Sequence, residues 1–274
     1  MRERPIIAAL YVPGDRPDRF GKAATSGADL VILDLEDAVA TGRKDDARRA
    51  VVDYLSTPPP CPVAVRVNGA DTPWHTADLD ALASSAHVSA IRLPKCESPE
   101  QVDETSRRAG GRGVQAVIES AIGVERLYDI ACAEATVGVS LGEADLRSAL
   151  AISDPDGLGW VRSRLVVAAA AAGLPAPLMS VWTDVTDREG LAASCRAGKS
   201  RGFLGRAAIH PAQVPVIRDA FRPTDDEIAG ARTILEALAR AASESSGVAV
   251  LPDGRMVDEA MRRGAARTVA LADE

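Results

Sequence analysis

The stretch Leu30-Val31-Ile32-Leu33-Asp34-Leu35-Glu36-Asp37 decides the fold of this chain. It begins with four consecutive large apolar residues and ends in three acids interrupted by one leucine. A continuous apolar run, without alternation, is typical of a strand buried on both faces of a parallel sheet. Acids that follow such a run lie at the carboxyl end of the strand, where α/β barrels collect their chemistry.

Similar apolar runs recur along the chain, and stretches of Ala, Leu and charged residues with helical spacing separate them. The predicted strands are residues 6–11, 30–35, 63–68, 90–94, 114–119, 136–141, 177–181 and 203–209. Strands that alternate with helices indicate βαβ units and a parallel sheet. Eight such units in 274 residues favour an α/β fold of the closed (β/α)8 TIM-barrel type over an open sheet.

The pattern changes after residue 222. Thr224 and Glu227 form a capping box, which predicts a helix over residues 224–243. A polar loop, a turn at Pro252-Asp253-Gly254 and a final helical segment over 255–270 follow. We therefore predict a barrel catalytic domain of residues 1–222 and a C-terminal helical extension or lid of residues 223–274.

Composition excludes several classes of protein. Aspartate and glutamate outnumber lysine and arginine by 39 to 32, which argues against a nucleic-acid partner. No apolar run approaches the length that spans a bilayer, so we expect no membrane partner. The four cysteines are too widely spaced for a metal site, and we expect a cytoplasmic protein in which they stay reduced.

Two acids at predicted strand ends are candidates for metal binding. Glu119 ends the fifth strand, and Asp145 follows the sixth. Mg²⁺ prefers one or two carboxylates together with water and substrate oxygens, and neighbouring strand ends supply such a pair. The alternative is that each acid only stabilises the first turn of the next helix.

Arg66 is a basic residue within the apolar strand Val63-Ala64-Val65-Arg66-Val67-Asn68. A buried guanidinium needs a partner, and its fork fits a carboxylate in bidentate fashion. The partner is a substrate carboxylate or, alternatively, Glu36 or Asp37 in a structural ion pair. His210 closes the eighth strand, where a hydrogen-bonding role at the strand end is the stronger interpretation.

Eight motifs occur in an order that resembles one enzyme family, the citrate lyase β-subunit-like CoA-ester lyases of the HpcH/HpaI aldolase superfamily. The resemblance covers nearly the whole chain. The motifs are Tyr11-Val12-Pro13-Gly14-Asp15-Arg16-Pro17, Leu33-Asp34-Leu35-Glu36-Asp37-Ala38-Val39, Val65-Arg66-Val67-Asn68, Leu93-Pro94-Lys95-Cys96-Glu97-Ser98, Ile118-Glu119-Ser120-Ala121-Ile122-Gly123, Leu141-Gly142-Glu143-Ala144-Asp145-Leu146, Ala208-Ile209-His210-Pro211-Ala212-Gln213 and Gly254-Arg255-Met256-Val257-Asp258.

The resemblance implies a Mg²⁺-dependent barrel, usually a homotrimer, that cleaves or forms a carbon–carbon bond in a 3-hydroxyacyl thioester. By motif match, Glu119 and Asp145 would hold Mg²⁺ and Arg66 would bind the substrate carboxylate or keto-acid oxygen. The same match would place Arg16 and Lys95 along the path of CoA.

Proton transfer needs an acid and a base beside the substrate. Glu36, Asp37 and Asp258 are the candidates, and the resemblance implies that Asp258 reaches the site of a neighbouring subunit. The expected reaction is cleavage of a short ester such as malyl-, methylmalyl- or citramalyl-CoA into an acyl-CoA and a keto acid. Three alternatives stay open: a citryl-carrier-protein lyase subunit of citrate lyase, a non-catalytic barrel that binds CoA esters, and a CoA-independent keto-acid aldolase.

Overall fold

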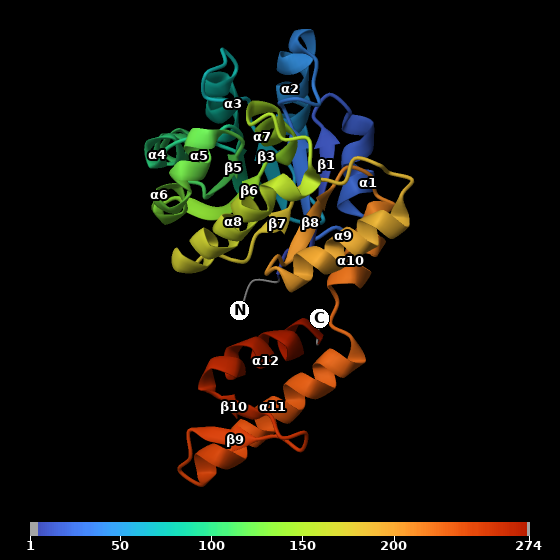
Figure 1. Ribbon diagram of the computed structural model, residues 1–274. Coiled ribbons are helices and arrows are strands. Elements are labelled where there is room, and N and C mark those ends of the chain that lie inside the picture. Colours follow the sequence, from blue (N-terminus) through green and yellow to red (C-terminus); the bar gives the residue numbers. More distant parts are fainter. Residues whose placement is uncertain (1–4, 273–274) are drawn as a thin grey trace. The chain divides into compact units, whose positions relative to one another are not determined.

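A computed structural model describes residues 5–272 of the chain, and its strands confirm the predicted barrel. All eight predicted strands are present, and two short strands lie in the C-terminal part (Figure 1). The barrel strands are β1 (Ala8–Pro13), β2 (Leu30–Asp34), β3 (Val63–Arg66), β4 (Ala90–Leu93), β5 (Val114–Ile118), β6 (Thr136–Leu141), β7 (Leu178–Met179) and β8 (Gly205–Ala208).

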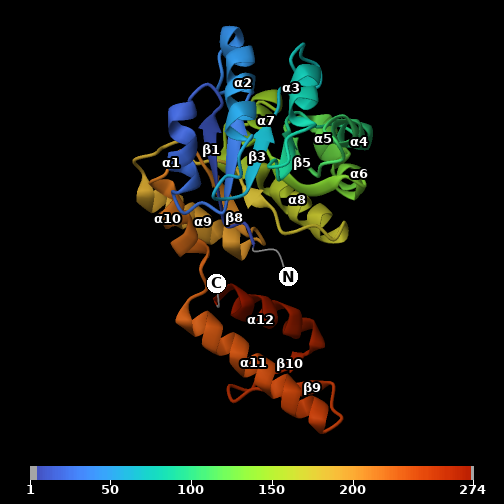
Figure 2. The same ribbon diagram turned by 180° about the vertical axis from the view of Figure 1, so that it is seen from behind.

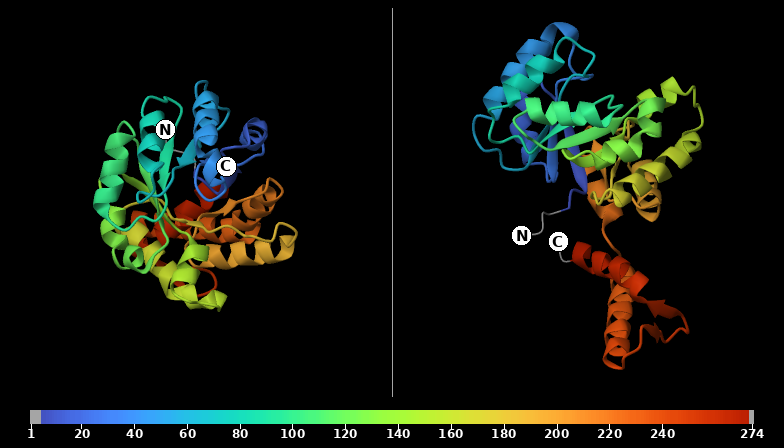
Figure 3. Two further views of the ribbon diagram at one scale, coloured as in Figure 1. Left: turned by 90° about the horizontal axis from the view of Figure 1, so that it is seen from above. Right: turned by 90° about the vertical axis from the view of Figure 1, so that its left-hand side faces the viewer.

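The strands pair in parallel in the order β6-β5-β4-β3-β2-β1-β8-β7, and they curl into a nearly closed barrel with the helices outside (Figure 3, left). Within the described residues, β6 and β7 share no backbone ladder. One side-chain hydrogen bond joins the ends of these two strands: the Ser180 hydroxyl, just after β7, donates to the Leu141 carbonyl of β6 at 2.6 Å. Strand β7 is shorter than predicted, with two residues instead of five.

Alternating side chains of the strands fill two cores. Leu10, Val12, Leu33 and Val65 belong to the larger core between the strands and the helices. The inner core, inside the barrel, contains Ala9, Leu30, Ile32, Ala64 and Ala90. Apolar residues therefore fill both faces of the strands, which is why the strands read as continuous apolar runs.

Helices follow the strands around the barrel (Figure 2). They are α1 (Phe20–Ala24), α2 (Lys44–Tyr54), α3 (His75–Leu82), α4 (Pro99–Arg108), α5 (Ala121–Glu125), α6 (Leu127–Cys132), α7 (Glu143–Ala149), α8 (Gly159–Ala171), α9 (Arg188–Ser200) and α10 (Gln213–Phe221). Among the helices of residues 5–272, none combines the length and the apolar character needed to cross a bilayer.

The chain divides into two compact units between Phe221 and Arg222. The second unit consists of α11 (Asp225–Ser243), β9 (Val248–Val250), β10 (Met256–Asp258) and α12 (Glu259–Ala272). The predicted capping box is confirmed: the Glu227 amide donates to the Thr224 hydroxyl at 3.2 Å, and the Thr224 amide donates to Glu227 at 2.8 Å. Residues 256–258, predicted as helix, instead pair with β9, and Ala237, Leu238, Leu251 and Val257 form a small core.

Candidate active site

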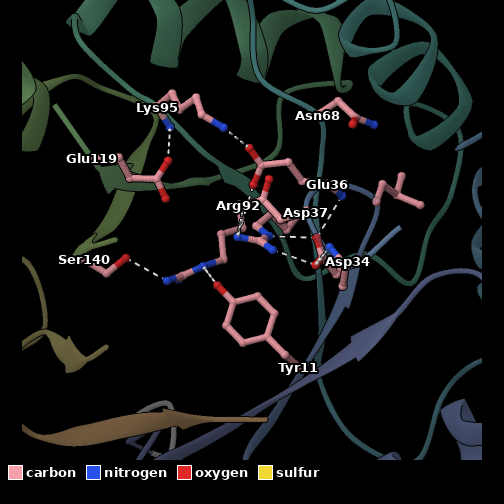
Figure 4. A network of polar contacts seen from close by, with 12 residues as sticks. Tyr11, Asp34, Glu36, Asp37, Asn68, Arg92, Lys95, Glu119 and Ser140 are labelled. Atoms are coloured by element: carbon pink, nitrogen blue, oxygen red, sulfur yellow. Dashed lines mark hydrogen bonds and ion pairs between the residues drawn. The ribbon is translucent and has the colours of Figure 1, made fainter. Parts of the chain in front are cut away.

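Carboxylates and cations from neighbouring strands gather at the carboxyl ends of β2 to β5 (Figure 4). Arg66 ends β3 and is in register with Asp34, the last residue of β2. Its Nε and Nη2 donate to the two Asp34 oxygens at 2.7 and 2.6 Å, so the pair is bidentate. Its Nη1 lies 3.1 Å from Glu36 and 3.7 Å from Asp37.

The ion pairs of Arg66 with Glu36 and Asp37, which the sequence offered as the alternative to a substrate carboxylate, are therefore present, but the main partner is Asp34. Asp34 is almost fully buried, and it also accepts the backbone amides of Glu36 at 2.9 Å and Ala38 at 3.2 Å. This role of Asp34 was not predicted, although the sequence carries one signal for it: in a parallel sheet, polar residues at consecutive strand ends are lateral neighbours.

Lys95 joins this cluster from the end of β4. Its Nζ lies 2.6 Å from Glu36 Oε1, and its backbone amide donates to Glu119 Oε2 at 3.1 Å. Lys95 has a φ of 51°, a left-handed conformation that a lysine seldom adopts and that costs about 1 kcal/mol. This backbone geometry directs the amide of Lys95 at Glu119 while the side chain reaches Glu36.

Glu36 and Glu119 are buried carboxylates with perturbed acidity. Burial raises the pKa of Glu36, although the charges of Arg66 and Lys95 oppose that shift. Burial, together with the negative charges of Glu36 and Asp145, raises the pKa of Glu119 to about 7. Asp145 itself is exposed in the first turn of α7, which follows β6, and β6 pairs with the strand β5 that precedes Glu119.

Gly142, between β6 and α7, lies directly against the Glu119 side chain. A Cβ at residue 142 would lie 2.7 Å from Glu119 Cδ and closer still to Oε1 and Cγ. Since real Cβ atoms do not approach other atoms this closely, the Glu119 carboxylate occupies space that only a glycine leaves open.

The charges at the strand ends fit a divalent cation. Four carboxylates gather there with three cations, namely Asp34, Glu36, Asp37 and Glu119 with Arg66, Lys95 and Lys44. Among residues 5–272, no group of three or more His, Cys, Asp or Glu side chains could hold a metal ion. A carboxylate pair completed by water and substrate oxygens is the arrangement that Mg²⁺ prefers.

Side chains of helix α2 hold the loop that carries Glu36 by hydrogen bonds to its backbone. The buried Lys44 Nζ donates to the carbonyls of Leu35 at 2.9 Å and Glu36 at 2.7 Å. One turn later, Arg48 donates to Asp78 at 2.7 Å. Both cations lie on one face of α2 because they are four residues apart.

Asp78 in turn accepts the Asn68 backbone amide at 3.0 Å and side-chain amide at 2.6 Å. The helix therefore fixes the chain just beyond β2 and β3. The side chains of Lys44, Arg48 and Asp78 are supporting residues that sequence analysis did not identify.

Arg16 and His210 lie outside this cluster, and Asp258 belongs to the second unit. Arg16 is half-buried and pairs with Asp18 at 3.1 Å. His210 Nδ1 accepts the Ala212 amide at 3.1 Å, which confirms the hydrogen-bonding role at the end of the eighth strand. Asp258, in the second unit, accepts the Ala260 amide at 3.0 Å at the start of α12.

Residues 8–211 match the model of the HpcH/HpaI aldolase/citrate lyase family. The chain is 40% identical over 257 residues to the citrate lyase subunit beta-like protein of Mycobacterium tuberculosis, a match that covers 91% of this chain and 89% of that protein. It is 32% identical over 291 residues to the L-malyl-CoA/beta-methylmalyl-CoA lyase of Cereibacter sphaeroides, with coverages of 93% and 91%.

A similar solved structure is that of protein CitE from Mycobacterium tuberculosis in complex with magnesium, acetoacetate and coenzyme A. It superposes with a TM-score of 0.84 at 37% identity and covers 100% of both chains. The family match spans most of the barrel, and the resemblance predicted from the motifs is confirmed. The chain belongs to the HpcH/HpaI aldolase/citrate lyase family.

Proposed function

We propose that this protein is a Mg²⁺-dependent carbon–carbon lyase that cleaves a short 3-hydroxyacyl-CoA thioester into an acyl-CoA and a keto acid. Malyl-, methylmalyl- and citramalyl-CoA are the substrates that we favour. The observation that carries the proposal is the excess of carboxylates around Arg66 and Glu119, in a family that includes a malyl-CoA lyase and a magnesium- and CoA-bound structure.

Glu119 and Asp145 would hold the metal. Burial, Glu36 and Asp145 all disfavour the charged form of Glu119 and raise its pKa, and a cation bound between Glu119 and Asp145 would offset these effects. When bound, Mg²⁺ supplies a Lewis acid that polarises the oxygens of the keto-acid half. Lys95 supports the pair because its backbone amide fixes one Glu119 oxygen.

Cleavage requires removal of the proton on the 3-hydroxyl group. As that oxygen becomes the keto oxygen, the carbon–carbon bond breaks and its electron pair passes to the α-carbon of the departing thioester. The thioester enolate then takes up a proton to give the acyl-CoA. The positive charge of Arg66 would balance the charge of the keto-acid half, while its bidentate fork stays on Asp34.

Glu36, Asp37 and Asp258 are the acid/base candidates. Glu36 is buried between Arg66 and Lys95, and burial raises its pKa, as suits a group that exchanges protons with a substrate. Asp37 is more exposed, with 59% of its side chain accessible, and it contacts only Arg66 among the cations of the site. Arg16 and Lys95 are the residues that we propose for contact with CoA.

A second candidate function is the lyase subunit of citrate lyase, which would act on a carrier-protein thioester. The relative named citrate lyase subunit beta-like protein favours it. The two candidate functions differ in the group that carries the thioester, CoA or a carrier protein. The bond that is cleaved and the chemistry of its cleavage are the same. Homotrimeric assembly and a cytoplasmic location stay predictions.

The test is product analysis with a panel of esters. The purified full chain is incubated with malyl-, methylmalyl- and citramalyl-CoA in Mg²⁺, and the products are separated and identified by mass spectrometry. We expect a keto acid and a shorter acyl-CoA from at least one ester. The proposal is wrong if no ester yields a keto acid, and formation of keto acid only from carrier-linked citryl thioester would favour the citrate lyase function.

A further inference from the structure

Arg92 is a second arginine on the strands beside the candidate active site. It lies on β4, in register with Arg66 on β3, and only 6% of it is exposed. Its guanidinium donates to the Tyr11 hydroxyl at 2.7 Å and to Ser140 Oγ at 2.8 Å (Figure 4). It also donates to Gln115 Oε1 at 3.3 Å. Three strands other than its own therefore hold Arg92 in one orientation.

All three acceptors are neutral. Among residues 5–272, no carboxylate lies within ion-pair distance of Arg92, whereas the half-buried Arg48, Arg66 and Arg162 each pair with an acid. A buried charge without a counter-charge is costly, and native proteins seldom keep one that has no role. A guanidinium has five N–H donors, so two of them are left after these three hydrogen bonds.

The other cations of the site are already paired. Arg66 donates from Nε and Nη2 to Asp34, and its Nη1 forms an ion pair with Glu36. The Lys95 ammonium also forms an ion pair with Glu36. The Tyr11 ring contacts both guanidinium groups, with the Arg66 carbon 5.0 Å and the Arg92 carbon 5.7 Å from its centre. Arg92 is thus a cation beside Arg66 with spare donors and no acid of its own.

We propose that Arg92 is a substrate-selecting residue that binds a carboxylate of the keto-acid half. The inference rests on the proposed function, since it takes the reacting molecule to be an acid, and it adds a second anion-binding arginine to the site. The carboxylate has two possible sources. It is either the one beside the keto group, present in every keto acid, or a second carboxylate at the far end of a dicarboxylic keto acid.

The test is binding of keto acids to the Mg²⁺-loaded full chain by isothermal titration calorimetry. Pyruvate carries one carboxylate and oxaloacetate carries two, so together they distinguish the two sources. We expect Arg92→Met to raise the Kd of oxaloacetate by about 10- to 100-fold, the range for loss of a charged hydrogen bond. An equal loss for pyruvate assigns the carboxylate beside the keto group, and a loss confined to oxaloacetate assigns the distal one.

Arg92→Lys is the matched variant, because it keeps the charge and removes the fork. We expect its Kd to lie between those of the wild type and Arg92→Met, and it provides the same test if the methionine variant does not fold. Binding of free CoA is the internal control and is expected to change less than twofold in both variants. Circular dichroism checks the fold.

The proposal is overturned if a folded Arg92 variant binds both keto acids with the wild-type Kd, or if the wild type binds neither. Arg92 would then have only a structural role. The proposed function has a separate criterion, cleavage of CoA esters by the wild-type chain. A wild type that cleaves esters while Arg92→Met binds keto acids normally refutes the role of Arg92 alone.

Discussion

Substitution of Gly142 by alanine tests the packing that places the Glu119 carboxylate. In the folded chain, the new methyl carbon would lie 2.7 Å from Glu119 Cδ, and Oε1 and Cγ would be closer still. Carbon atoms in contact are separated by about 3.5–4.0 Å, so the carboxylate has to move by about 1 Å. Glu119 is buried and its other oxygen is fixed by the Lys95 amide, which leaves little room for that movement.

Two magnitudes follow for Gly142→Ala. Overpacking of this kind lowers the free energy of unfolding by about 1–3 kcal/mol, so the variant should still fold. A site functions when its groups are held within about 0.5 Å of their productive positions, and a 1 Å shift exceeds that tolerance. We therefore expect the Kd for Mg²⁺ to rise by about 10- to 100-fold, comparable to the loss of a supporting contact in other metal sites.

The measurement is Mg²⁺ titration by calorimetry, with thermal unfolding of the metal-free proteins in parallel. Gly138→Ala is the matched control, because Gly138 lies on β6, the strand just before Gly142, and its new Cβ would be 3.9 Å from Gln115 Cγ, an ordinary contact. We expect wild-type Mg²⁺ affinity for this control. Wild-type affinity in Gly142→Ala as well would refute the reasoning about Glu119.

Three further predictions concern other residues of the site. Arg66→Lys replaces a bidentate fork by a point charge, and we expect kcat/KM for ester cleavage to fall by about two to three orders of magnitude, which equals ~3–4 kcal/mol of transition-state stabilisation. A loss below tenfold with a normal circular dichroism spectrum would contradict this expectation. Lys44→Met removes the ammonium that holds the backbone at Glu36, so we expect the free energy of unfolding, measured with denaturant, to fall by about 1–3 kcal/mol and kcat to be lower. An unchanged kcat would contradict the supporting role of Lys44. If Asp258 acts in the site of a neighbouring subunit, inactive Asp258→Asn and Glu119→Gln chains should regain partial activity after dissociation and reassociation, and no recovery after verified subunit exchange would exclude it.

The fold was predictable because it depends on patterns that are local in the sequence. A run such as Leu30–Asp34 is apolar for burial on both faces and ends in acids, and the capping box at Thr224 sets the start of α11. The lengths of the strands were less predictable: β3, β7 and β8 have four, two and four residues instead of the predicted six, five and seven. Two residues of β7 pair with β8, and a Ser180 side chain bridges to β6 where a longer ladder was expected.

The site was predictable only in part, because partners across strands are set by register. Arg66 was identified as a charged residue in an apolar strand, but Asp34 becomes its main partner only when β2 and β3 align. Arg92 was missed because its acceptors come from β1, β5 and β6, which are far from β4 in sequence. The closeness of Gly142 to Glu119 likewise arises from the packing of β5 against β6.

Metal-dependent release of a keto acid from a CoA ester tests the central claim most directly. The rate of keto-acid release from the best ester of the panel is measured for the wild type in Mg²⁺, after EDTA and after Mg²⁺ is restored, and for Glu119→Gln and Asp145→Asn. We predict release in Mg²⁺, loss in EDTA, recovery on re-addition, and rates at least about a hundredfold lower in both folded variants. Keto-acid release that persists in EDTA, or at wild-type rate in either variant, would contradict the assignment of a magnesium centre at Glu119 and Asp145.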